Sequence, residues 1–216
     1  MRWITFDCFG TLVDWHRGFA SILTPLVGDR GPQLLRAYHR LERHLELATP
    51  HHLYRDVLTT SLSRAAEEVG VPLSESQARA LPERWGTLPV FADVEPMLAE
   101  LRAAGYRLAV LTNCDDDLFE LTHRSFAARF DLVVTAERVR DYKPSASHFR
   151  YFSRSSGVRE GDWIHVACSW YHDIAPARSL GIKCVWLDRD DTGEDPATAS
   201  AHVRSAFEVN EVVAKL

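Results

Sequence analysis

The stretch ITFDCFGTLVD, from Ile4 to Asp14, decides the fold of this 216-residue chain. Apolar, β-branched and aromatic residues precede Asp7, which predicts a short buried strand that ends at a carboxylate. Gly10 permits a tight turn after the strand, and the Thr11 hydroxyl can hold an anion or a carboxylate in a crevice. From this segment alone, Asp7 is either a reacting group or a turn and cap residue.

Residues 15–90 have helical periodicity and no convincing strand. Apolar residues recur at i, i+3 and i+4 spacing from Phe19 to Leu26 and again from Leu34 to Leu45. A third helix is expected over 53–69, and Ser74 with Gln77 makes a capping box for a fourth. We therefore predict a helical cap at 15–90, inserted directly after the first strand.

From Val90 onward, helices and strands alternate. Further strands are expected at 107–112, 132–135, 163–167 and 183–187, and helices at 94–104, 118–126, from 144 or 145, and at 173–180. The segment 189–200 is expected to be a surface loop, 207–209 a last short strand, and Asn210 the cap of a terminal helical turn. This alternation predicts an α/β fold, a Rossmann-like parallel sheet covered by helices on both faces, built from residues 1–14 and 91–216.

The composition limits the partners. A net charge of −5, without a Lys/Arg cluster on an aromatic-rich face, argues against nucleic acid. No apolar run is long enough to span a membrane, and Met1-Arg2-Trp3 leads into a strand and not into a signal-peptide core. The four cysteines form no CxxC pair and are expected to be reduced. We expect a cytoplasmic protein, with a homodimer as one option for its oligomeric state.

Polar side chains follow four successive strands of the predicted sheet. In an open parallel sheet, ligands bind outside the carboxyl ends of the strands, where these side chains should meet. Each residue has a structural alternative as a helix cap, a turn residue or a solvated charge, but their succession at one edge favours a functional site. The residues are Asp7, then Thr112 and Asn113, then Glu137 and Lys143, and finally Cys168, Ser169 and Asp173.

Four segments in this order resemble the motifs of the haloacid dehalogenase superfamily: FDCFGTL from Phe6, LTN from Leu111, YKP from Tyr142, and HD at His172 with Pro176-Ala177. The resemblance covers nearly the whole chain, and the helical block resembles the cap of that superfamily. It implies that Asp7 is a nucleophile that forms a covalent ester or acyl-phosphate, which water later splits. Positive charge would come from Lys143, the water would be activated near Asp173 and Lys143, and Thr11, Thr112 and Asn113 would supply hydrogen bonds.

Phe9 narrows the range of reactions that this site could catalyse. Phosphatases of the superfamily carry a second Asp two residues after the nucleophile, which protonates the leaving oxygen, whereas Phe9 cannot transfer a proton. An aromatic residue at this position resembles the L-2-haloacid dehalogenase branch, which usually has Tyr there and works without a metal. The leading hypothesis is therefore a cofactor-free hydrolase that displaces halide or a related group from a small, anionic, 2-substituted carboxylic acid.

The chain departs from that branch at three positions. Phe149 stands where the branch has a Tyr, and Cys168 and Trp170 stand where it has Ser and Asn, so the polar pair that positions water is missing. The cap arginine that holds carboxylate and halide in this branch has two candidates, Arg36 and Arg40, which spacing does not separate.

Aromatic residues are expected to line an apolar pocket at this site. The candidates are Phe9, Tyr54, Trp170 and Tyr171, with packing in the core as the alternative for each. His172, next to Asp173, could relay a proton to the hydrolytic water, although a histidine at a helix end is the commoner case.

Three other functions compete with this hypothesis. The first is a magnesium-dependent phosphohydrolase in which Asp7, the Phe9 carbonyl and Asp173 bind the metal. The second is hydrolytic opening of a strained amino-acid ring, which needs an acid that the sequence does not identify. The third is a catalytically silent member of the superfamily that only binds a small acid.

Overall fold

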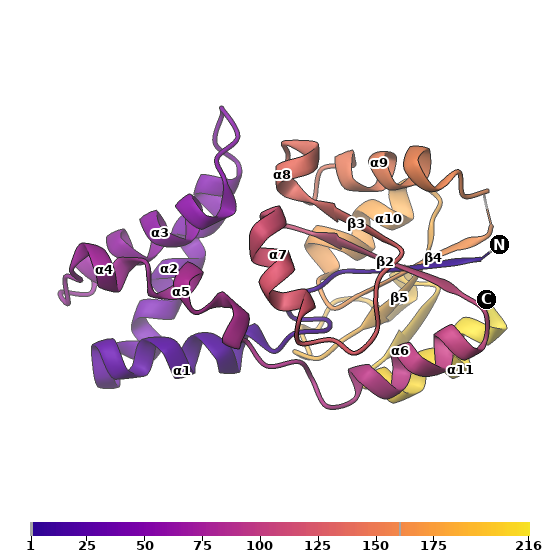
Figure 1. Ribbon diagram of the computed structural model, residues 1–216, viewed down its shortest axis with the longest axis horizontal. Coiled ribbons are helices and arrows are strands. Elements are labelled where there is room, and N and C mark those ends of the chain that lie inside the picture. Colours follow the sequence, from indigo (N-terminus) through magenta and orange to yellow (C-terminus); the bar gives the residue numbers. More distant parts are fainter. Residues whose placement is uncertain (1, 160) are drawn as a thin grey trace.

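The computed structural model describes residues 2–159 and 161–216, and its sheet is parallel throughout. The strand order is β3-β2-β1-β4-β5-β6 (Figure 1). Since β2 and β4 flank β1, the segments that follow these three strands meet at one edge of the sheet. The bounds are β1 Trp3–Phe6, β2 Arg107–Thr112, β3 Leu132–Thr135, β4 Trp163–Ala167, β5 Lys183–Leu187 and β6 Ala201–Val203.

Side chains of each central strand alternate between two apolar layers. Ile4 and Phe6 pack on one face, with α6 (Val94–Ala103) and α11 (Val209–Lys215), whereas Trp3 packs on the other. That second face is covered by α9 (Ser147–Ser156) and α10 (Ala175–Ser179). Figure 1 shows α6 and α11 side by side on one side of the sheet and α9 on the opposite side. Burial on both faces explains the nearly continuous apolar strands of this sequence.

The helices between β1 and β2 form a separate layer, the cap, seen at the left of Figure 1. Its first helix begins after Asp14, which accepts a hydrogen bond from the Arg17 amide at 3.0 Å, and the predicted capping box of Ser74 and Gln77 is present. At the base of the cap, Val13 pairs with Val90. The cap helices are α1 Trp15–Val27, α2 Gly31–Glu46, α3 Tyr54–Glu68, α4 Glu75–Ala78 and α5 Ala80–Glu83, with 3-10 turns at Gly28–Arg30 and Trp85–Thr87.

Strands β1 to β5 have the predicted bounds, but the C-terminal prediction was wrong. The last strand is β6, and Ala206–Glu208 is a 3-10 turn that leads directly into α11. Ser205 and Glu208 form a capping box there, so local hydrogen bonds favour a helix start over an extended segment. Asn210 accordingly lies inside α11 and does not cap it.

Helix boundaries near the site also differ from the predictions. The helix expected from 144 or 145 begins at Ser147, and the one expected at 173–180 begins as a π-helical turn, η3 (Trp170–Ile174), that continues into α10. The helix expected at 118–126 is α7 (Asp116–His123), and α8 (Ala136–Val139) was not expected. Among the described residues, no helix has the length and apolar character needed to cross a bilayer.

Candidate active site

A cavity of about 530 Å³ lies between the carboxyl ends of the central strands and the cap. Asp7, Thr112 and Asn113 line it from β1, β2 and the segment that follows, and Asp173 lines it from η3. Residues of α1, α2 and α3 close it from the cap side. All of the predicted strand-end residues except Glu137 therefore line a cavity that the fold places at the edge expected for a ligand.

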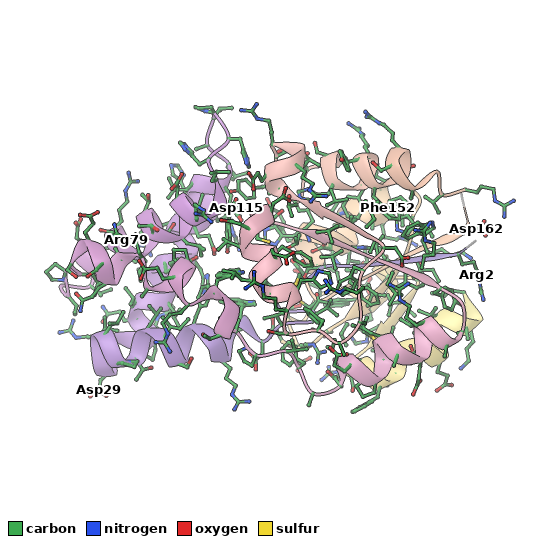
Figure 2. The ribbon with its side chains drawn as sticks, viewed as in Figure 1. Arg2, Asp29, Arg79, Asp115, Phe152 and Asp162 are labelled. Carbon is green, nitrogen blue, oxygen red and sulfur yellow. The ribbon has the colours of Figure 1, made fainter. Side chains whose placement is uncertain are left out.

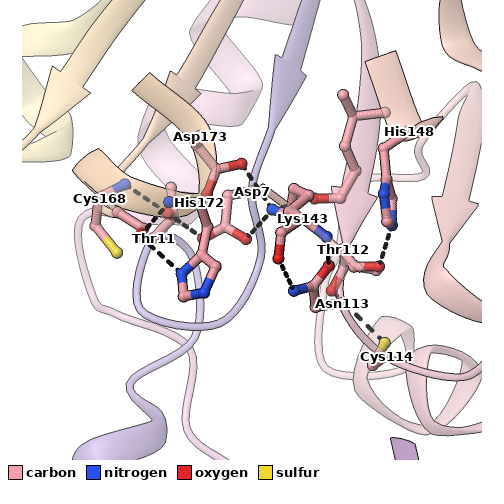
Figure 3. Close-up of polar contacts among 12 residues, drawn as sticks. Asp7, Thr11, Thr112, Asn113, Cys114, Lys143, His148, Cys168, His172 and Asp173 are labelled. Atoms are coloured by element: carbon pink, nitrogen blue, oxygen red, sulfur yellow. Dashed lines mark hydrogen bonds and ion pairs between the residues drawn. The ribbon is translucent and has the colours of Figure 1, made fainter. Parts of the chain in front are cut away.

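Lys143 is the centre of a buried ion-pair network. Its Nζ donates to Asp7 Oδ1 at 2.8 Å, to Asp173 Oδ1 at 2.7 Å and to the Leu111 carbonyl at 2.9 Å (Figure 3). The Lys143 side chain is almost wholly buried, and Asp7 retains slight exposure toward the cavity. All three donor positions of the ammonium are thus occupied, and the two carboxylates are fixed on either side of it.

The charged groups of this network stabilise one another's ionised forms. Burial alone would lower the pKa of Lys143, but Asp173 and Asp7 outweigh this effect and raise the pKa above its ordinary value. Burial alone would raise the pKa of Asp173, but Lys143 and His165 outweigh it, so this pKa lies below the ordinary value. Asp173 is therefore ionised and Lys143 is protonated at neutral pH.

Thr11 orients the second oxygen of Asp7. Its hydroxyl donates to Asp7 Oδ2 at 2.6 Å and accepts from the Cys168 amide at 2.9 Å. The Gly10 φ of +95° shapes the turn between Asp7 and Thr11, and a Cβ on Gly10 would lie 2.8 Å from Cys168 Sγ. The loop after β1 therefore needs glycine at position 10 both for its backbone conformation and for its approach to Cys168.

Asn113 positions Lys143 through the backbone. The Lys143 amide donates to Asn113 Oδ1 at 2.7 Å, and Asn113 Nδ2 donates to the Lys143 carbonyl at 3.1 Å. Thr112, one residue earlier, is buried at the end of β2 and lines the cavity. Its carbonyl accepts from His148 Nε2 at 3.1 Å. Asn113 thus supports the lysine, and both Thr112 and Asn113 line the cavity.

Asp173 is supported from behind by a buried chain of polar groups. His165 Nε2 lies 3.0 Å from Asp173 Oδ1, and His165 Nδ1 lies 2.8 Å from the Thr5 hydroxyl, which also accepts from the Trp163 indole at 2.8 Å. Thr5 and His165 are register partners on β1 and β4. We did not assign these two residues to the site from the sequence, because only the pairing of β1 with β4 brings them together.

Asp173 has one oxygen that accepts no hydrogen bond from any described residue. Its Oδ2 is buried at the cavity and has no hydrogen-bond partner within residues 2–159 and 161–216. A buried carboxylate oxygen without a partner is costly unless water or a ligand reaches it. Oδ2 is therefore the acceptor that this site offers to a bound water.

All four aromatic residues predicted for the pocket line the cavity, namely Phe9, Tyr54, Trp170 and Tyr171. Phe9 is partly exposed and packs at 4.7 Å, centroid to centroid, on Trp85, which comes from the end of the cap segment. Trp170 also lines the cavity, and its indole Nε1 has no partner among the described residues. Phe149, at the position where we expected a Tyr, is instead a core residue that packs edge-on against His165 at 5.1 Å.

The two predicted cap arginines do not reach the cavity. Arg36 and Arg40 are exposed, and Arg40 pairs with Glu68 of the neighbouring helix. The arginine of α2 that does line the cavity is Arg43, whose guanidinium lies 5.7 Å from the centre of the Tyr171 ring. The rotation of α2 about its axis relative to the core brings Arg43 to the cavity. The spacing of apolar residues in the sequence does not reveal that rotation.

Two carboxylates of α2 also line the cavity and were missed. Glu42 accepts from the hydroxyls of Tyr38 and Tyr54 at 2.7 and 2.6 Å. Glu46 follows one turn later and lines the same cavity, near Lys143 and Asn113. The sequence signal was a pair of acids four residues apart in the helix that also contains Arg43.

Other polar groups near the site have local roles. The Ser169 hydroxyl accepts from the His172 amide at 3.1 Å and lies 3.0 Å from His172 Nδ1. Burial lowers the pKa of His172, which keeps this ring neutral. Glu137 accepts from the Asp116 amide at 2.8 Å, at the start of α7, and does not line the cavity.

The residues predicted for a magnesium site do not fit one. Mg²⁺ requires about six oxygen ligands in octahedral geometry. One oxygen of Asp7 and one oxygen of Asp173 are paired with the Lys143 ammonium, so neither carboxylate is free to give both oxygens to a metal. Within the described residues, no group of three or more His, Cys, Asp or Glu side chains is arranged to hold a metal ion.

A parallel α/β core with a helical cap over an Asp-Lys-Asp network defines the class of capped α/β enzymes. Residues 1–181 match the family model of the haloacid dehalogenase-like hydrolases. The chain therefore belongs to the haloacid dehalogenase-like hydrolase family.

Individual relatives give the same family and two kinds of activity. The chain is 23% identical over 206 residues to haloacetate dehalogenase H-2 of Moraxella sp. (strain B), covering 89% of this chain and 90% of that one. It is 33% identical over 138 residues to the phosphoserine phosphatase of Thermus thermophilus, covering 61% of this chain and 55% of that one. A crystal structure of an L-2-haloacid dehalogenase has a TM-score of 0.88 at 23% identity, with 99% of both chains covered.

Proposed function

We propose that Asp7 displaces a leaving group from carbon 2 of a small carboxylic acid, as in the hydrolysis of a 2-haloacid. One observation carries the proposal: the Asp7 carboxylate is held by Lys143 and Thr11 in a cavity where Phe9 occupies the position of the phosphatase acid. Halide is a weak base and departs without a proton, so Phe9 does not impede its displacement. The similarity to a haloacetate dehalogenase over most of both chains supports the same reaction.

The geometry supports two chemical steps. An Asp7 oxygen attacks carbon 2, the leaving group departs with its electron pair, and an ester forms with inversion at that carbon. Water at Asp173 Oδ2, the oxygen without a protein partner, then attacks the ester carbonyl and releases the 2-hydroxy acid. Lys143 and Thr11 already contact the Asp7 oxygens, and the same donors stabilise negative charge on the carbonyl oxygen.

The alternative is a phosphohydrolase, which the similarity to phosphoserine phosphatase favours. This reaction needs a metal, which Asp7, the Phe9 carbonyl and Asp173 would hold. It also needs a proton donor, and Phe9 cannot act as one. Lys143 already pairs with both carboxylates. We therefore rank it second. The location in the cytoplasm, the preference for anionic substrates and the absence of a cofactor remain predictions of the proposal.

A substrate panel tests this proposal. We expect chloride release from 2-chloropropionate that EDTA does not change, and no phosphate release from phosphomonoesters. Asp7→Asn should lower kcat roughly 10³-fold or more, because the amide is a much poorer nucleophile. Asp29→Asn, at an exposed position of the cap, is the matched control.

Three results would contradict the proposal. Phosphate release that collapses in EDTA would select the phosphohydrolase. Chloride release that Asp7→Asn leaves intact would exclude Asp7 as the nucleophile. Binding of a 2-haloacid without any product, unaffected by Asp7→Ala, would identify a silent binding module.

A further inference from the structure

Glu42 and Glu46 place two carboxylates on the cap wall of the cavity, opposite the core residues of the site. Both lie on α2, four residues apart, and both line the cavity together with Asp7. Residues at this spacing share one helical face, so the two side chains are neighbours. Neither residue has a part in the reaction proposed above.

The two carboxylates have different surroundings. Glu42 accepts two phenolic hydrogen bonds, from Tyr38 and Tyr54, and its second oxygen lies 3.2 Å from His39 Nδ1. Such donors stabilise the ionised form. Glu46 receives neither phenol, lies beside Glu42 and has the Asn113 side chain as its hydrogen-bond donor. Of two adjacent carboxyl groups, the one with fewer donors retains a proton more readily.

The electrostatics of Glu46 agree with this asymmetry. Burial and the charge of Glu42 raise its pKa well above the ordinary value, and Lys143, Arg43 and the Asn113 side chain offset this only in part. His39 and Arg43 of α2 also line the cavity on the cap side. Glu46 is thus a carboxylic acid in the cavity, at a pH where ordinary Glu side chains are ionised.

Asp7 and Glu46 line the same cavity, Asp7 from the core and Glu46 from α2 of the cap. Asp7 attacks from the core side of the cavity, at the carboxyl end of β1. In-line displacement sends the leaving group away from the attacking oxygen, and so away from the carboxyl end of β1. Glu46 is a carboxyl group that the cap offers in this cavity, whereas Phe9 offers none on the core side.

We propose that Glu46 protonates the leaving atom, so that the enzyme accepts 2-substituted acids with a basic oxygen or nitrogen leaving atom as well as halides. This inference rests on the nucleophilic role proposed for Asp7. As the bond from Asp7 to carbon 2 forms, the bond to the leaving atom breaks, and that atom keeps the electron pair and takes the proton of Glu46. Hydrolysis of the ester by water regenerates the Asp7 carboxylate and returns one proton to Glu46.

A series of substituted acetates tests the role of Glu46. Chloroacetate loses chloride without a proton, whereas phenoxyacetate loses a phenoxide that needs one. In Glu46→Gln, we expect the ratio of kcat/KM for chloride release to kcat/KM for phenol release to rise about 100-fold or more. Glu67→Gln, at an exposed position of α3, is the matched control and should keep the wild-type ratio.

A second variant tests the proton itself. Glu42→Gln removes the negative charge that raises the pKa of Glu46, so the loss of phenol release at high pH should move to lower pH. An unchanged rate ratio in Glu46→Gln, or wild-type enzyme that releases chloride but no phenol, would overturn the inference and leave the proposed function standing. Failure to release chloride, with no Asp7 ester from chloroacetate, would overturn both.

Discussion

At the scale of single residues, the site depends on buried groups whose protonation the fold fixes. His148 is wholly buried behind the site, and its Nε2 donates to the Thr112 carbonyl at 3.1 Å. Its Nδ1 has no partner among the described residues. Burial and the charge of Lys143 lower the pKa of His148 to about 3. This ring is therefore neutral in the folded protein, and its protonation at low pH opposes folding.

We expect His148 to make the protein sensitive to acid. Its pKa in the unfolded chain is about 6.5, so between that pH and about 3 the unfolded state binds a proton that the folded state does not. The free energy of unfolding should therefore fall by up to about 1.4 kcal/mol for each pH unit through this window, and be recovered above it.

Urea unfolding of wild type, His148→Gln and His44→Gln between pH 4 and 8 measures this contribution. His148→Gln should show a shallower dependence on pH than wild type, while His44→Gln, at an exposed position of α2, keeps the wild-type slope. Equal slopes in all three proteins would refute the role of His148.

At the scale of elements, the first cap helix approaches the core connection very closely. A Cβ on Gly18 of α1 would lie 2.3 Å from Leu88 Cδ2 and 3.3 Å from Pro89 Cδ. On Gly31, the first residue of α2, a Cβ would come no closer than 3.9 Å to the Thr24 side chain, at its Oγ1. Two glycines of neighbouring helices thus differ in the space around them.

This difference predicts opposite effects of the same substitution. Gly18→Ala should lower the free energy of unfolding by about 1–3 kcal/mol, because overpacking outweighs the gain in helix propensity. Gly31→Ala should leave it unchanged or raise it by up to about 1 kcal/mol. Thermal and urea unfolding of both variants decide the matter, and a stabilised Gly18→Ala protein would contradict this account of the contact.

The elements also mark where pattern reasoning succeeds. The strands β1 to β5 are predictable because they are short apolar runs buried on both faces. The strand predicted at 207–209 is wrong because the apolar residues there suit a strand as well as a helix, and the capping box of Ser205 and Glu208 favours the helix.

At the scale of the whole molecule, a core carboxylate holds the cap in place. Asp115, at the start of α7, is almost wholly buried and accepts from the amides of Tyr54 and Arg55 at 2.7 and 2.9 Å. These amides are the unpaired donors at the N-terminus of α3. Figure 2 labels Asp115 where the core meets the cap. Asp115, which is distant in sequence, thus provides the N-terminal capping interaction that no neighbouring residue gives to α3.

Removing this contact should loosen the cap. We expect Asp115→Ala to destabilise the protein by about 1–3 kcal/mol and to accelerate amide exchange over the first turn of α3, because two buried amides lose their acceptor. Hydrogen exchange measured by mass spectrometry would detect the change. Asp117→Ala is the control, since Asp117 is exposed and pairs with the Arg55 side chain, not with the α3 amides. Equal exchange in both variants would contradict this role for Asp115.

The sequence by itself determined the parallel α/β sheet, the inserted helical cap and the identity of Asp7, Lys143 and Asp173 as groups that meet at one edge. Strand burial and chain order fix these features, and both are local. Only the tertiary structure decided which face of α2 meets the core, and so placed Arg43, Glu42 and Glu46 at the cavity in place of Arg36 and Arg40. The physical reason is that contacts between cap and core, distant in sequence, set the phase of that helix.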